Sequence, residues 1–216
     1  MLGWNHEIAQ KISEPGFALE PFQTLQQWQR RRLAESYSDL IEQESYRPAC
    51  AFFLDELYAG MNFLKRDQAV AKVMPVMEKF LPGKALLVMA GAFELQALSL
   101  EFDLDMAERL DSSGAVKLDI ASYGVIYRSC GNRSLRERQI LLIRDLGNEL
   151  AKLVHKPFLV HLIRMMRGPA YAAGVGALQA FLESGVLSFR KLDDPCYFIN
   201  TIYNREWLSM QELFAG

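Results

Sequence analysis

Residues 84–100 read KALLVMAGAFELQALSL, and this stretch decides the fold class of the chain. Apolar side chains occupy nearly every face of a helix built from it, so the helix must be enclosed by other helices or by lipid. Its length of about 17 residues is the lower limit for crossing a bilayer, and one carboxylate, Glu94, lies near its middle. The stretch therefore predicts a central buried helix of an all-α protein, and no membrane span.

Helix start and stop signals surround this apolar segment. Pro21 can open a first helix, residues 134–137 (SLRE) have the spacing of a capping box, and residues 194–195 (DP) combine a cap with a favoured first position. Residues 125–127 (VIY) are compatible with a strand, but no partner strand is evident and we favour a helix. The pattern predicts an irregular bundle of about eight helices around residues 84–100.

The composition is that of one soluble domain. The length of 216 residues predicts a single α-helical domain, 1–216, with residues 1–19 as a loosely packed N-terminal arm. The net charge of −2 gives no electrostatic case for nucleic acid. Residues 1–108 hold 10 basic against 16 acidic side chains and residues 109–216 hold 14 against 10, or −6 and +4. We interpret this difference as attraction between the two halves of the fold.

The cysteines indicate a reducing compartment. Cys50, Cys130 and Cys196 are odd in number and far apart, and no Cys-x-x-Cys motif is present. This usage is typical of free thiols rather than of a disulfide framework. The first ten residues also lack the basic-then-apolar order of a targeting segment. The sequence therefore predicts a cytoplasmic location.

Sequence motifs for metal binding and catalysis are absent. None of the three histidines follows a glutamate by three positions, which excludes the Glu-x-x-His motif of di-iron bundles. The chain also lacks the Gly-x-Ser-x-Gly nucleophile motif. His161, among Phe158, Leu162 and Met165, is the best candidate for a single heme ligand, but such a histidine is more often a core or rim residue. We predict no metal, no cofactor and no catalytic residue.

One group of charged residues is a candidate binding site. Glu94 is a carboxylate in an apolar wall, while Arg164 and Arg167 are three residues apart and share a helix face, with His161 just before them. A carboxylate opposite two guanidiniums is either a structural buried pair or the polar end of a ligand pocket. Both readings stay open at this stage, and these four residues are our candidate ligand-binding set.

Two blocks of the sequence resemble a known family. The blocks are FFLDELY (52–58) with RD (66–67), PVM (75–77) and LP (81–82), and RGPA (167–170) with GVGALQAFLE (174–183). With them the chain resembles an uncharacterised, mainly proteobacterial family of unknown function. The resemblance implies an all-helical cytoplasmic protein and brings no assigned catalytic residue.

Three functions are compatible with these observations. The first is a non-catalytic interaction or regulatory module, in which outward aromatic side chains of residues 52–58 and 207–214 dock a protein partner or form a homodimer. The second is a binding protein for a small apolar or amphipathic ligand held between helices, with Glu94, Arg164 and Arg167 at its polar end. The third is a cofactor-free enzyme that uses Glu94 as a buried general base. The missing catalytic motifs favour the first.

Overall fold

The computed structural model describes residues 19–57, 83–113 and 118–216, together with residues 8, 11, 12, 14, 16 and 17. Every regular element within these ranges is helical, so the predicted all-α bundle is confirmed. Residues 58–82, which include part of the first family-like block, lie outside the described residues.

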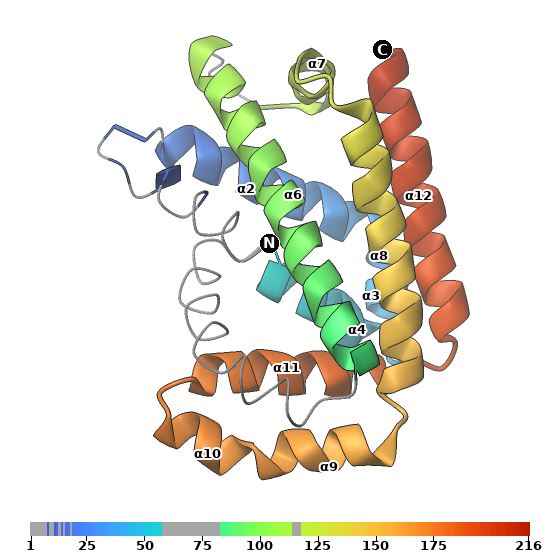
Figure 1. The fold of residues 1–216 in the computed structure, drawn as a ribbon. Coiled ribbons are helices and arrows are strands. Elements are labelled where there is room, and N and C mark those ends of the chain that lie inside the picture. The colour runs from blue at the N-terminus through green and yellow to red at the C-terminus, as the bar shows by residue number, and fades with distance from the viewer. Residues whose placement is uncertain are drawn as a thin grey trace.

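The chain order of the elements is as follows (Figure 1). They are α2 (Leu19–Ser36), α3 (Ser38–Glu42), α4 (Arg47–Phe52), the π-helical turn η1 (Phe53–Leu57), α6 (Gly83–Ser113), α7 (Ile120–Ser129), α8 (Arg133–Leu153), α9 (Pro157–Met165), α10 (Arg167–Ala172), α11 (Gly176–Phe189) and α12 (Pro195–Ala215). The long helices α6, α8 and α12 run up the molecule, α11 crosses its lower end, and α9 and α10 form a layer beneath α11 (Figure 1).

The capping signals had mixed outcomes. Asp194 caps α12 as predicted, because its Oδ1 accepts a hydrogen bond of 2.8 Å from the Tyr197 amide. The capping box predicted at residues 134–137 is wrong. Helix α8 begins earlier, at Arg133, with Asn132 as its N-cap. Gly131 and Asn132 both have a positive φ (71° and 48°), so the turn between α7 and α8 ends at Asn132. Glu137 points instead to the Arg133 side chain, at 3.1 Å. Residues 125–127 are helical, as favoured.

Helix α6 contains the apolar stretch and extends well past it. Its second half is enclosed: residues such as Ala97, Phe102 and Met106 are buried against α2 and α8. Its first half is partly open, and Leu87 is 73% exposed. By length and composition alone, residues 83–112 form a helix that could cross a membrane, with 28% of the apolar window buried. The enclosure expected for the whole stretch is therefore found in only part of it.

Two large hydrophobic clusters make the core. The α6–α7 cluster gathers side chains of α2, α6, α7, α8 and α12, and Ile8 and Ile12 of the expected N-terminal arm are buried in it. The α4–α11 cluster gathers side chains of α3, α4, α9, α11 and α12. Helices α8 and α12 lie side by side and link the two clusters (Figure 1). Gly147 permits this approach, because a Cβ there would be 3.1 Å from Ile199 Cγ1.

The α8–α12 contact at Gly147 gives a test of this packing. We expect Gly147→Val to lower the free energy of unfolding by about 2 kcal/mol, because the added atoms overfill the contact with Ile199. Gly83→Val is the control, since no atom outside its own chain neighbours lies within 4 Å of that position, and we expect it to change stability by less than about 0.5 kcal/mol. Urea unfolding measures both. Equal effects of the two substitutions would contradict the close contact.

Candidate functional site

Glu94 of α6 is held by α8. Arg138 Nε donates to Glu94 Oε1 at 3.0 Å, and Arg138 Nη2 donates to Glu94 Oε2 at 3.3 Å. The Glu94 side chain is 27% exposed and that of Arg138 is 53% exposed. This is a bidentate ion pair at the edge of the bundle, and exposed pairs of this kind contribute about 0.2–1 kcal/mol to the free energy of unfolding. Its role is to join two helices.

Arg167 of α10 is paired with Glu183 of α11. Arg167 Nε donates to Glu183 Oε2 at 3.1 Å, and a second hydrogen bond joins Arg167 Nη2 to Glu183 Oε1. Hydrogen bonding by Arg167 lowers the pKa of the Glu183 carboxyl, and the positive charge of Arg164 adds to this effect. Arg167 is thus paired with Glu183 and not with Glu94, and Arg164 acts on the same carboxylate through its charge alone.

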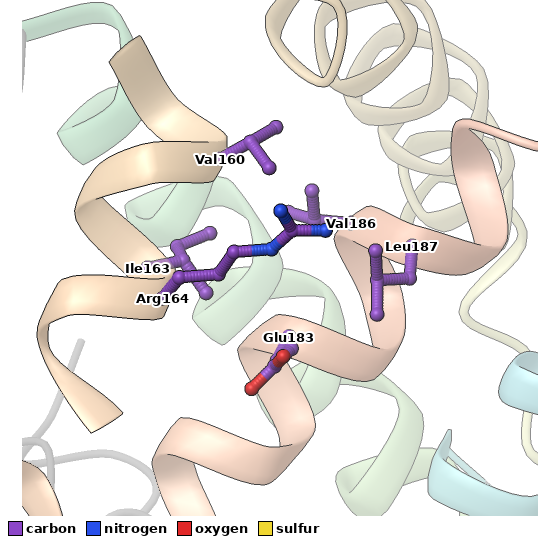
Figure 2. Close-up of a pocket in the computed structure, with 6 residues that line it drawn as sticks. All are labelled: Val160, Ile163, Arg164, Glu183, Val186 and Leu187. Atoms are coloured by element: carbon purple, nitrogen blue, oxygen red, sulfur yellow. The ribbon is translucent and has the colours of Figure 1, made fainter. Parts of the chain in front are cut away.

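Arg164 lies across the contact between α9 and α11. Figure 2 shows its side chain reaching from α9 past Ile163 toward Val186 and Leu187, with Glu183 below it and the Glu183 carboxylate pointing away from the guanidinium. The cavity lined by these residues has a volume of about 10 Å³. A volume of that size holds about one water molecule. A ligand has no room at this place.

The four candidate residues therefore do not form one pocket. Glu94 is ion-paired with Arg138, Arg167 is ion-paired with Glu183, and no ion pair joins Glu94 to Arg164 or Arg167, all of which are described residues. His161 is exposed on α9. The buried pair expected between Glu94 and these arginines is therefore not formed, and Glu94 and Arg167 each bind a residue of another helix instead.

Sequence reasoning missed a buried polar centre in the α6–α7 cluster. Asp103 of α6 is 7% exposed, and Gln26 Nε2 of α2 donates to its Oδ2 at 3.2 Å. Burial raises the pKa of Asp103 to about 6, against the opposing effects of hydrogen bonds from Gln26 and Gln29 and of the Arg136 charge. From the sequence alone, no role is assigned to Asp103. Leu100 lies three residues before Asp103 and Ala107 four residues after it, and both are buried. Residues at these spacings share a helix face, so the sequence could have indicated that Asp103 faces the core.

Arg136 of α8 is the cation of this centre. It is 8% exposed, and its guanidinium carbon lies 3.8 Å from the ring centroid of Phe102 and 4.5 Å from that of Tyr127. Its Nη2 also lies 3.3 Å from Met106 Sδ. A cation over aromatic rings is attracted by their quadrupole, which makes the electrostatic potential over each ring face negative. The side chain joins α8 to α6 and α7, which gives it a structural role.

An open cleft lies between the end of α8 and the start of α12. Its volume is about 310 Å³, and its lining includes Lys152, His155, Asp193 and Cys196. Cys196 is exposed, and its Sγ accepts a hydrogen bond of 3.3 Å from Asn200 Nδ2. Among the described residues, no three His, Cys, Asp or Glu side chains are placed to share a metal ion. The cleft brings a histidine and a thiol to one surface, which sequence spacing did not indicate.

The described aromatic side chains of the two segments expected to face outward are partly buried, and Tyr58 lies outside the described residues. The ring centroids of Phe52 and Phe181 are 5.3 Å apart, and those of Phe53 and Phe189 are 5.7 Å apart. Trp207 and Phe214 pack against the α6–α7 cluster. Part of their apolar area is thus used in packing within the chain, which leaves less of it for the outward contact expected from the sequence.

Three of the large apolar side chains that are exposed among the described residues lie on the neighbouring helices α9 and α10. Phe158 and Met165 are each 58% exposed, and Tyr171 is 63% exposed. Phe158 and Met165 lie about 20° apart around α9, because seven residues make nearly two turns. We name the outer side of α9 and α10, with these three residues and His161, the α9–α10 face.

The chain belongs to the family described as Domain of unknown function (DUF8198), whose model matches residues 9–216. This confirms the expected membership of an uncharacterised family. No curated protein and no solved structure matches the chain.

Asp103 predicts a pH dependence of stability. Its pKa of about 6 in the folded chain exceeds the value of about 3.9 for an unfolded aspartate, so the folded state binds more protons between these two values. The free energy of unfolding therefore falls as the pH rises from about 4 to about 6, by on the order of 2–3 kcal/mol. Asp103→Asn should remove this component. Urea unfolding of both proteins across that range measures it, and parallel pH profiles would refute the assignment.

Proposed function

We propose that this chain is a non-catalytic binding module, and that the α9–α10 face is its contact surface. The observation that carries the proposal is the exposure of Phe158, Met165 and Tyr171 on two neighbouring helices. Single exposed apolar residues are ordinary on a protein surface, but a group of them marks an interaction site. Placing one such side chain in an apolar environment contributes about 1.5–3 kcal/mol.

The same structure gives the alternatives less support. The cavity between α9 and α11 is far smaller than the roughly 300–1,000 Å³ of small-molecule sites. Glu94 is engaged by Arg138, so it offers little to an enzyme that needs a buried general base. The cleft between α8 and α12, at about 310 Å³, keeps small-ligand binding as a second candidate.

We further propose a cytoplasmic location. The support is that Cys50, Cys130 and Cys196 are all free thiols, one of them exposed, as expected in a reducing compartment.

Fractionation by size tests the binding module. In extracts of cells that express the full chain, we expect part of it in an assembled or sedimenting fraction, apart from the monomer. Phe158→Ser combined with Met165→Ser should move it to the monomer fraction, because the substitutions remove the apolar contact area. Ile120→Ser with Val125→Ser is the matched control, since these α7 side chains are 62% and 59% exposed and lie elsewhere. A chain that is wholly monomeric, or that responds equally to both double variants, would contradict the proposal.

A further inference from the structure

The α9–α10 face lies in a part of the chain that carries no acidic residue. Residues 150–182 contain no Asp and no Glu, although the chain as a whole has 26 acidic side chains among 216 residues. The same segment contains four cations: Lys152, Lys156, Arg164 and Arg167. The segment itself therefore carries an excess of positive charge in a chain whose net charge is −2.

Part of this positive charge is left without a partner. Lys152 is ion-paired with Glu149, Arg167 is ion-paired with Glu183, and Arg164 acts on the Glu183 carboxylate through its charge alone. Lys156 is exposed and makes no ion pair within the described residues. The α9–α10 region thus carries at least two uncompensated positive charges, one at each end of α9.

The geometry of α9 suits a flat, partly apolar partner. Phe158, His161 and Met165 are exposed on one side of the helix, while Leu159, Val160 and Leu162 are buried on the other. Figure 1 shows α9 and α10 as the outermost layer below α11. A helix that lies along a surface, with apolar residues outward and cations at its edges, has the arrangement of interfacial helices.

We propose that the α9–α10 face docks onto an anionic lipid surface, with Phe158 and Met165 entering the interface, Lys156 contacting the headgroups, and Arg164, at the edge of α9 that meets α11, adding to the positive potential. This rests on the proposed function, because it names the partner of the same surface. The attachment is peripheral and requires no helix to span the bilayer.

Two observations favour lipid over other anionic partners. Nucleic acid binding depends almost wholly on neutralising several phosphates, whereas docking onto lipid also draws on the insertion of Phe158 and Met165, so two uncompensated cations fit lipid better. Protein interfaces are anchored by side chains that fill pockets, whereas the cavity beside Arg164 holds only about 10 Å³. A fluid lipid surface needs no such pocket, because the exposed side chains themselves insert.

Vesicle binding of the purified full chain tests the proposal. One set of vesicles contains phosphatidylcholine alone, and in the other about a third of the lipid is phosphatidylglycerol. We expect co-sedimentation with the anionic vesicles, much weaker co-sedimentation with the neutral ones, and release when salt is raised to about 0.5 M, because salt screens surface charge. Equal binding to both vesicles, or binding to neither, would overturn the proposal.

Matched variants locate the contact. Lys156→Gln with Arg164→Gln should weaken partitioning into anionic vesicles roughly thirtyfold, because each cation near such a surface contributes about fivefold. Phe158→Ser with Met165→Ser should also reduce binding, and Ile120→Ser with Val125→Ser on α7 should leave it unchanged. If the protein still binds anionic vesicles when either pair of α9 residues is replaced, the proposal is wrong. It is also wrong if the chain forms a dimer that dissociates when Phe158 and Met165 are replaced and that does not bind vesicles.

The two proposals can fail separately. If vesicle binding is absent while the assembled fraction in cell extracts still depends on Phe158 and Met165, the lipid assignment is wrong and the binding module stands. If neither assay depends on these residues, both proposals are wrong.

Discussion

A buried guanidinium constrains the core of this protein. Arg136 leaves water to lie against the rings of Phe102 and Tyr127, beside Met106. Removing a charge from water costs several kcal/mol unless nearby groups compensate it. The compensation comes from side chains of α6 and α7 and from the nearby carboxylate of Asp103, so the packing of α6, α7 and α8 is fixed together.

This constraint decides which surfaces remain open. With the second half of α6 fixed against α2 and α8, the apolar side chains of its first half are only partly covered, as the exposure of Leu87 shows. Helix α12 packs on α8 at Gly147. Its side chains Phe198 and Ile199 belong to the α4–α11 cluster, which lies below the α6–α7 cluster (Figure 1). One side of helix α9 covers the α4–α11 cluster. The opposite side of α9 is exposed to solvent, and it forms part of the surface that we propose for binding.

The fold was predictable from the sequence because its signals are local. Helical periodicity, and the Asp194 cap with the proline that follows it, act within a few residues, and they gave the correct class and one correct helix start. The candidate site was less predictable because it depends on which helices meet. Glu94 is bound by Arg138, 44 positions later in the chain, and no periodic pattern indicates that pairing. The burial of Asp103 was readable from its apolar neighbours one turn away, since Leu100 and Ala107 flank it on the same face.

Replacing Arg136 tests the buried-cation account most directly. We predict that Arg136→Leu lowers the free energy of unfolding at pH 7 by about 3 kcal/mol, because it leaves the Asp103 carboxylate uncompensated in the core. Near pH 5 the loss should shrink, since Asp103 is then largely protonated. Arg138→Leu, at a side chain that is 53% exposed, should cost less than about 1 kcal/mol at either pH. An Arg136→Leu protein as stable as the wild type at pH 7 would contradict the account.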